Sequence, residues 1–437
     1  MSKLKLVLSP LLIAAGLLFA SVTVANAQNE RSAGDSERTA KVSLAPVELT
    51  ASDGVAGNAL GTSVAASGRT IVVGENCGEI GGNTNCNPNH QGVVYVYKEP
   101  KGGWENMAQT AELTPSDGYV GDGFGTSVAI SGSTIVVGAL NGLNGKVYVF
   151  VEPRGGWKNM TETAQLTDGM SGDYFGGAVA IDENTIVAGA PTATIGGNQS
   201  QGAAYVFVEP QTGWVTTSAF SAQLTASDGS FRDGFGFSTT VSGETIVVGG
   251  PDHQGQTGPG EAYVFVKPPA GWASTTQTAI LTRSNPGPYD EFGSAVAIEA
   301  NTIVVGAPQA VGTNNGQGVV DIFVKPSKGW GDATEKAELV SPFFVDLFGF
   351  SIAIEGRDVV VGTFSTSNTI FVYAKPTKGG WESTSQPESE LTAGNSISCF
   401  GFSVAITDSS ILAGAPFQTV EGQEDQGAAF EIGRAHV

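Results

Sequence analysis

The sequence predicts an all-β protein, a seven-bladed β-propeller with four antiparallel strands in each blade. Two observations lead to this prediction. A unit that starts with a phenylalanine-glycine pair returns along the chain at intervals of 51 to 64 residues. Each unit divides into four short segments with the composition of strands, and turns rich in glycine separate them. Repeats of about 50 residues built from short strands are typical of radial arrays of sheets.

The phenylalanine-glycine pair occurs seven times, once in a weakened form. The pairs are Leu60-Gly61, Phe124-Gly125, Phe175-Gly176, Phe235-Gly236, Phe292-Gly293, Phe348-Gly349 and Phe400-Gly401. In the first segment, such as FGTSVAI at 124–130, small residues alternate with apolar ones, which suits an inner strand crowded near an axis. The second segment, such as TIVVGA at 134–139, is apolar at consecutive positions. Both of its faces should be buried, as expected where sheets stack around a ring.

The third segment, such as KVYVFVEP at 146–153, ends at a proline, which cannot donate a hydrogen bond to a strand ladder. A turn with a Gly-Trp pair then leads to the fourth segment, such as AELT at 111–114. All six tryptophans of the chain lie at this repeat position: Trp104, Trp157, Trp214, Trp272, Trp330 and Trp381. We interpret each as a wedge that packs the outer strand against its neighbour, and the alternative is a platform on which sugars stack.

The two ends of the repeat array predict how the ring closes. Residues 47–50, VELT, are a segment of the fourth type that precedes the first unit, and the last unit ends before a fourth segment. We therefore expect this N-terminal strand to complete the last blade. Closure removes exposed strand edges, and its entropic cost rises only logarithmically with the enclosed length.

The chain divides into four parts. Residues 1–27 have a basic start, an apolar run and the cleavage site Ala25-Asn26-Ala27, and are interpreted as a signal peptide, with a retained membrane anchor as the alternative. Residues 28–46 are polar and predicted to be a flexible leader, and residues 47–430 form the propeller. The last residues, EIGRAHV at 431–437, resemble the translation of a sequencing adaptor. We interpret them as a non-native tail, the alternative being a natural polar tail.

The charge of the chain limits its partners. With 42 acidic and 21 basic residues, the formal net charge is −21 at pH 7. Such a surface repels nucleic acid and anionic lipid, so neither is expected as a partner. We expect an exported monomer that does not span a membrane in its mature form and resides in the periplasm, at the cell surface or outside the cell.

Three cysteines fit an exported protein. Cys77 and Cys86 lie in one loop, which favours a disulfide between them. The alternative is a metal site, although their spacing matches no zinc pattern. Cys399 is expected to pack as a small apolar residue.

The phenylalanine-glycine pairs combine with the tripeptide Gly-Ala-Pro at 189–191, 306–308 and 414–416. With these motifs and the Tyr-Val-Phe strand, the sequence resembles the FG-GAP repeat family over about residues 47–430. This family comprises seven-bladed propellers found in integrin alpha chains and in many exported bacterial proteins. Integrin-type blades often carry a calcium loop, D-x-D-x-D-G, between the first and second strands. Here that connection is a tight turn in every unit and D-x-D-x-D-G is absent from the sequence, so those calcium sites are not carried over. No cofactor is predicted, and calcium binding is left open.

In a propeller, the loops from fourth to first strands and from second to third strands share one face, which we call the long-loop face. Here these loops are long and variable, and loops on a rigid scaffold are the usual binding surface. In five units an aspartate stands two residues before the phenylalanine: Asp122, Asp173, Asp233, Asp290 and Asp346. In the other two units this position is filled by Asn58 and Ser398. One interpretation is a ring that binds a cation or a polar ligand. The other is that each side chain bonds nearby backbone N–H groups and fixes its turn.

Catalysis has little support in the sequence. His90 and His253 lie at matching places in second-to-third loops of the long-loop face, and His436 lies in the tail. No nucleophile elbow and no pairing of a nucleophile with a base is recognisable. We predict a non-catalytic binding or adhesion propeller that recognises an extracellular protein or glycan through the long-loop face. The alternatives are an enzyme that cleaves polysaccharide with carboxylates of this face, and a structural module of a longer surface protein.

Overall fold

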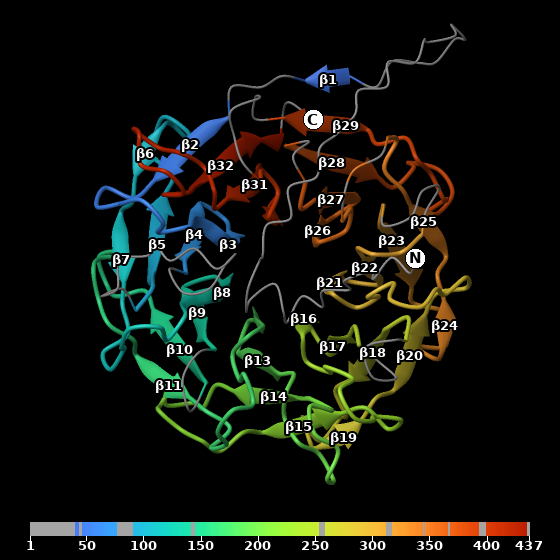
Figure 1. Ribbon diagram of the computed structural model, residues 1–437. Coiled ribbons are helices and arrows are strands. Elements are labelled where there is room, and N and C mark those ends of the chain that lie inside the picture. Colours follow the sequence, from blue (N-terminus) through green and yellow to red (C-terminus); the bar gives the residue numbers. More distant parts are fainter. Residues whose placement is uncertain are drawn as a thin grey trace, which may run out of the picture.

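The computed structural model describes residues 40–42, 46–76, 91–140, 145–252, 258–311, 317–343, 345, 347–365, 368–392 and 399–434. Every element in this part of the chain is a β-strand, and the strands form seven sheets arranged as blades around an axis (Figure 1). The predicted seven-bladed propeller is therefore confirmed.

Each blade contains four antiparallel strands, and we number the blades from 1 to 7 in the order of their innermost strands. The innermost strands are β3 (Leu60–Ser67), β8 (Phe124–Ser131), β12 (Val179–Asp182), β16 (Ser238–Ser242), β21 (Ala295–Glu299), β26 (Ser351–Glu355) and β30 (Ser403–Ile406). The second strands are β4 (Thr70–Glu75), β9 (Thr134–Ala139), β13 (Thr185–Ala190), β17 (Thr245–Gly250), β22 (Thr302–Ala307), β27 (Asp358–Gly362) and β31 (Ser410–Ala415). The third strands are β5 (Val93–Lys98), β10 (Lys146–Val151), β14 (Ala203–Val208), β18 (Glu261–Val266), β23 (Val319–Val324), β28 (Thr369–Ala374) and β32 (Ala428–Gly433). The outer strands are β7 (Ala111–Leu113), β11 (Ala164–Leu166), β15 (Ala222–Thr225), β20 (Ala279–Thr282), β25 (Ala337–Leu339), β29 (Ser389–Thr392) and β2 (Val47–Thr50).

The ring closes as predicted, because β2 pairs antiparallel with β32 in blade 7. Val47 lies opposite Glu431, and Leu49 lies opposite Ala429. Blade 7 therefore joins the start of the propeller to its end, and both segments meet at one place in Figure 1.

The outer edge of each blade is covered by a parallel segment that the sequence did not reveal. In four blades this segment is a short fifth strand: β6 (Met107–Ala108) beside β2, β19 (Thr275–Thr276) beside β15, β24 (Ala333–Thr334) beside β20 and β1 (Ala40–Val42) beside β29. In the other three blades a single parallel bridge has the same role: Leu113 with Met160, Leu166 with Thr217 and Leu339 with Thr384. Except for β1, the covering segment belongs to the third-to-fourth connection of the next blade.

Strand β1 corrects the prediction that residues 28–46 form a flexible leader throughout. Ala40 pairs with Ser389 and Val42 with Leu391, on the outer edge of blade 6. The reason is topological. Blade 7 has no chain connection between β32 and β2, so the segment before β2 takes the place that the third-to-fourth connection fills elsewhere.

The last strand is longer than predicted. Instead of ending at Phe430, β32 continues to Gly433. Glu431 is buried, and its carboxylate accepts a hydrogen bond from the hydroxyl of Ser410 at 2.7 Å. Arg434 then forms an ion pair with Asp358 of blade 6 at 2.7 Å. Residues 431–434 are thus part of blade 7 and of its contact with blade 6, and residues 435–437 lie outside the described residues.

The apolar core lies between the blades rather than within them. All six residues are buried in second strands such as β9 and β17, as their apolar sequences predicted. Each core cluster joins adjacent blades, as where Val247 and Val264 of blade 4 pack with Phe292 and Ile303 of blade 5.

The glycines of the repeat motif meet at every blade boundary. A Cβ atom on Gly138 of β9 would overlap the carbonyl oxygen of Gly176, the motif glycine of the next blade. The same contact recurs at all boundaries, through Gly74, Gly189, Gly249, Gly306, Gly362 and Gly414. Gly176 itself has φ 88°, a conformation that favours glycine. The second-strand glycine and the motif glycine are therefore both required, because the two backbones approach closely at this contact.

Serine hydrogen bonds reinforce five of the seven boundaries. The serine two residues after the motif glycine donates to the motif glycine carbonyl of the next blade, at 2.7 to 2.8 Å. These serines are Ser63, Ser127, Ser238, Ser351 and Ser403, and the last bond reaches Gly61 and so crosses the ring closure. Blades 3 and 5 carry Ala178 and Ala295 at this position.

Candidate functional site: the long-loop face

Backbone hydrogen bonds join the two kinds of long loop into one face. Phe235, at the end of a fourth-to-first loop, donates its N–H to Gln201 of a second-to-third loop at 3.0 Å. Phe348 donates to Gln317 at 3.0 Å in the same way. Each loop is thus attached to the loop of the preceding blade, and the face is held in place by the repeat itself.

The Ser-Asp-Gly turns of this face are anchored to the blades. The hydroxyl of Tyr95 donates to Asp53 at 3.0 Å, and that of Tyr148 donates to Asp117 at 3.0 Å. A Cβ atom on Gly229 would overlap the side chain of Gln201. These turns are therefore fixed structural parts of the face.

Three of the five predicted ring aspartates fix their own loops. Asp122, Asp233 and Asp290 are buried. Asp122 accepts a hydrogen bond from the N–H of Tyr119 at 2.8 Å. Asp233 accepts from the N–H of Ser230 at 2.5 Å and from its hydroxyl at 2.7 Å. Asp290 accepts from the N–H of Gly287 at 2.7 Å. Each donor stands three residues earlier, so these contacts favour the turn interpretation. Asp173 is half-buried, and Asp346 lies outside the described residues.

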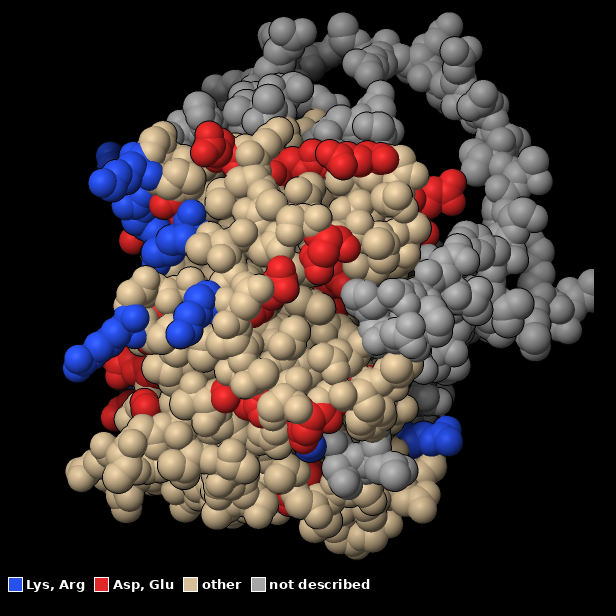
Figure 2. Space-filling view, turned by 90° about the vertical axis from the view of Figure 1, so that its left-hand side faces the viewer, with Lys and Arg blue, Asp and Glu red and all other residues tan. Residues whose placement is uncertain are grey.

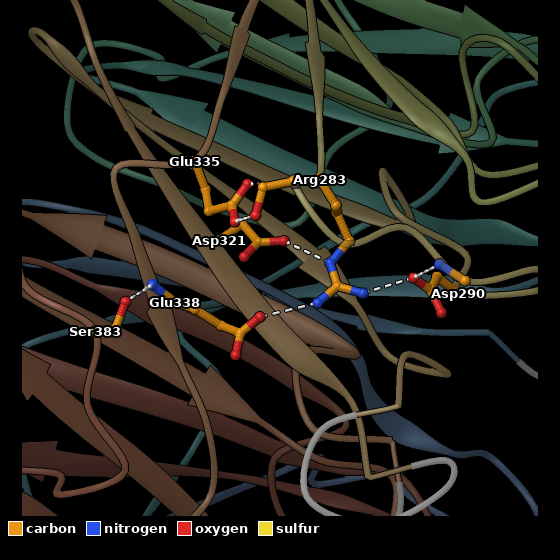
Figure 3. Close-up of polar contacts among 8 residues, drawn as sticks. Arg283, Asp290, Asp321, Glu335, Glu338 and Ser383 are labelled. Atoms are coloured by element: carbon orange, nitrogen blue, oxygen red, sulfur yellow. Dashed lines mark hydrogen bonds and ion pairs between the residues drawn. The ribbon is translucent and has the colours of Figure 1, made fainter.

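Asp290 belongs to a charge cluster that sequence reasoning missed (Figure 3). Arg283 follows the outer strand of blade 4 and has a side chain that is 4% exposed. Its guanidinium donates to Asp290 at 2.5 Å, to Asp321 at 3.0 Å and to Glu338 at 2.9 Å. All three carboxylates belong to blade 5 or to the loop that enters it, so the arginine joins blades 4 and 5. The sequence signal for this cluster was Asp321, because the other six third strands carry tyrosine or phenylalanine at its position.

The carboxylates of this cluster outnumber its single cation. Burial, and the nearby charges of Glu335 and Glu338, raise the pKa of Asp321 to about 7 despite its contact with Arg283. The cluster therefore depends on the guanidinium to keep its carboxylates in the interior.

Exposed apolar side chains gather on the long-loop face. Twelve large apolar side chains are exposed among the described residues, and nine of them lie in the loops of this face. They are Val55, Tyr119, Val120, Met170, Tyr174, Phe231, Tyr289, Val311 and Phe343. Six consecutive fourth-to-first loops each contribute at least one exposed apolar side chain, from the loop between blades 7 and 1 to the loop between blades 5 and 6. Exposed apolar patches rimmed by polar groups mark interaction sites.

Charge also distinguishes the two faces. In the described parts of its loops the long-loop face contains thirteen acidic residues and two basic ones, Arg232 and Arg283. The connections of the opposite face carry more basic side chains, among them Arg69, Lys101, Arg154, Lys158, Lys328, Arg357 and Lys378. Figure 2 shows most of the Lys and Arg of that view along its left-hand margin, whereas Asp and Glu are spread across the view, this margin included. The long-loop face therefore disfavours polyanions.

The tryptophans pack between strands. Trp157, Trp214, Trp272, Trp330 and Trp381 are buried in the core clusters, and Trp104 is half-buried against another cluster. This burial supports the packing interpretation, because a buried indole cannot present its face to a sugar.

The remaining predicted site residues lie largely outside the described part. This holds for His90, His253, Cys77 and Cys86. Cys399 is half-buried, and burial and the charge of Asp425 raise its pKa to about 11. Among the described residues, no group of three or more His, Cys, Asp or Glu side chains is arranged to hold a metal ion.

The fold and the contacts repeated between adjacent blades define a propeller built from repeats, in which each repeat spans the junction of two blades. A family model described as FG-GAP repeat matches residues 46–97, 107–150, 160–207, 219–265 and 275–323, together more than half of the chain. The chain belongs to the FG-GAP repeat family. Each matched segment begins at or before the outer strand of one blade and ends in the third strand of the next.

Two further findings concern the chain's relatives and its relation to membranes. A search of curated proteins found no match. FG-GAP repeat proteins are typically extracellular or located at the cell surface. Within the described ranges, no helix is long and apolar enough to cross a membrane.

Proposed function

We propose that this protein is an exported, non-catalytic binding module that recognises an extracellular protein or glycan through its long-loop face. The observation that carries the proposal is the concentration of exposed apolar side chains on that face. Tyr119 and Val120 are each 54% exposed at the tip of one loop, and Phe231 is 50% exposed at another. Exposure of such side chains to water is unfavourable unless a partner covers them.

The surroundings of these side chains support binding. Hydrogen bonds to neighbouring blades hold the loops, so little conformational freedom is lost when a partner docks. Tyrosine and phenylalanine provide large contact areas for proteins and flat surfaces for sugar rings. The excess of carboxylates directs the choice toward neutral glycans or toward proteins with basic surfaces.

The experiment is a binding screen with matched variants. Purified protein is applied to an array of neutral and acidic glycans, and to a panel of extracellular proteins, with calcium and with a chelator. We expect a hit that weakens at least tenfold in the double variant Tyr119→Ser, Val120→Ser. The matched control is Val215→Ser, Val324→Ser, which removes exposed apolar side chains elsewhere and should leave binding unchanged.

Two results would count against the proposal. Binding that is equal in the loop variant and the wild type would place the ligand on another surface. Turnover of a polysaccharide that is abolished by replacing one carboxylate of the long-loop face would favour the enzyme alternative.

A further inference from the structure

Two fourth-to-first loops of the long-loop face share one sequence pattern, D-G-x-x-G-D. The first is Asp117–Asp122 between blades 1 and 2, and the second is 168–173, from Asp168 to Asp173, between blades 2 and 3. Both lead to a phenylalanine-glycine pair two residues after the final aspartate. They can therefore be compared residue by residue.

In the first loop, a lysine of the protein provides the positive charge. Lys146, the first residue of β10, forms an ion pair with Asp117. Tyr148 and Gln165 also donate to Asp117, each at 3.0 Å. Although partial burial raises it, the contacts with Lys146 and Tyr148 bring the pKa of Asp117 below its usual value.

In the second loop, alanine takes the place of this lysine. Ala203 is the first residue of β14 and pairs with Ala190, in the same register in which Lys146 pairs with Ala139. Asp168 is 6% exposed, and its Oδ1 accepts a hydrogen bond from the N–H of Met170 at 2.9 Å. Its Oδ2 is buried and has no hydrogen-bond partner among the described residues.

The boundary between blades 4 and 5 offers a second comparison for Asp168. Asp168 directly follows the Leu-Thr end of an outer strand, as Arg283 does between blades 4 and 5. Arg283 reaches the ring aspartate of its own loop, Asp290, at 2.5 Å. Between blades 2 and 3 the residue that follows the Leu-Thr end is a carboxylate, Asp168, and the ring aspartate of its loop is Asp173. Burial and the charge of Asp173 raise the pKa of Asp168 to about 6.

Two other loops of the face that start with Asp-Gly differ from the loop at 168–173. In the loop between blades 7 and 1, which has valine at the lysine position, the final residue is Asn58. In the loop between blades 3 and 4, Ser230 donates to both oxygens of Asp233, and Asp228 is exposed to solvent. The loop at 168–173 has neither a lysine, nor an arginine, nor an amide in place of a carboxylate.

We propose that Asp168 and Asp173 bind a calcium ion, which supplies the charge that Lys146 and Arg283 supply at the other two boundaries. Calcium is a hard cation that takes six to eight oxygen ligands, so backbone carbonyls and water would complete its shell. The site lies on the long-loop face, whereas the calcium loops of integrin-type blades lie at the opposite end of the blade. The inference does not depend on the proposed function.

Calcium titration of chelator-treated protein tests the site. Melting temperature and isothermal calorimetry are recorded from 0 to about 10 mM CaCl2 at constant ionic strength, because extracellular calcium modules bind with Kd of about 10⁻⁴–10⁻³ M. We expect saturable binding of one ion and a rise in melting temperature. In Asp168→Asn, the Kd should increase at least tenfold, and the melting temperature without calcium should equal or exceed that of the wild type.

Two further variants separate this site from general screening. Lys146→Ala removes the cation of the first loop and should add a second, calcium-dependent rise in melting temperature. Asp228→Asn removes an exposed carboxylate of the same face and should leave the calcium response unchanged. The same response in wild type and Asp168→Asn, or no response up to about 10 mM calcium, would overturn the proposal.

Discussion

The blade boundaries and the long-loop face follow opposite rules. At the boundaries the same contacts recur around the ring: a second-strand glycine meets a motif glycine at all seven. On the long-loop face, loops of similar path carry different side chains, such as Tyr119 in one and Met170 at the matching place in another. Positions that repeat thus serve the scaffold, and positions that vary between blades are where recognition is to be sought.

The boundary between blades 4 and 5 departs from this rule, since Arg283 adds a buried charge cluster there. Replacing Arg283 with methionine should lower the free energy of unfolding by about 3–5 kcal/mol, because it leaves buried carboxylates without a cation. Urea unfolding measures the loss. The matched control is Arg357→Met, which removes an exposed arginine that donates to the carbonyl of Lys375 and should change stability by less than about 0.5 kcal/mol.

The loss in Arg283→Met should also depend on pH. In the wild type the folded-state pKa of Asp321 is about 7, above its value in an unfolded chain, so ionisation opposes folding as pH rises from about 4 to 7. Removing the guanidinium raises this pKa further. The variant should therefore lose more stability at pH 8 than at pH 5, and adding Asp321→Asn should restore part of it. An equal loss at both pH values would show that the cluster acts by packing alone.

The glycine contact is the next test in size. Gly138→Ala introduces a Cβ that overlaps the backbone of Gly176, so we expect a loss of about 3 kcal/mol from overpacking between two backbones. Gly331→Ala is the control, since a Cβ there meets nothing within 4 Å. Thermal and urea unfolding of the two variants measure the difference. Similar stability of both would mean that the boundary is looser than the repeated contact indicates.

The smallest effect should come from the boundary serines. Ser127→Ala removes a hydrogen bond of 2.8 Å to the carbonyl of Gly176 and should cost about 1 kcal/mol. The reverse change, Ala178→Ser, adds this donor to a boundary that lacks it and should stabilise the protein slightly. Chemical unfolding midpoints measure both. A loss on Ala178→Ser would show that blade 3 is spaced differently from blade 2.

The sequence was sufficient for the architecture because each blade repeats a strong local pattern. Consecutive apolar residues in β9 and β17 required burial on both faces, and the isolated segment at Val47–Thr50 required a partner at the other end of the chain. The covering strands were not predictable. β19 and β24 contain two residues each, too few for a periodic pattern, and they pair with a blade that the chain has already left.

The candidate site was predictable as a surface but not as a set of contacts. Loop lengths placed the long-loop face, and the ring aspartates were visible as a repeated position. Their bonds to N–H groups three residues earlier depend on loop conformation, which the residue types alone do not fix. Arg283, Asp321 and Glu338 are separated by up to 55 residues, so only the packing of blade 4 on blade 5 brings them together.

The pairing of β2 with β32 has a consequence for biosynthesis. A ribosome makes β2 near the beginning and β32 almost 380 residues later, which takes roughly 20–80 s at about 5–20 residues per second. During that interval β2 lacks its antiparallel neighbour β32 and can pair only with the two-residue strand β6, and the ring remains an open crescent. The native circle can form only after translation is nearly finished, so any factor that guards the nascent chain must keep this early strand from aggregating until the late one arrives.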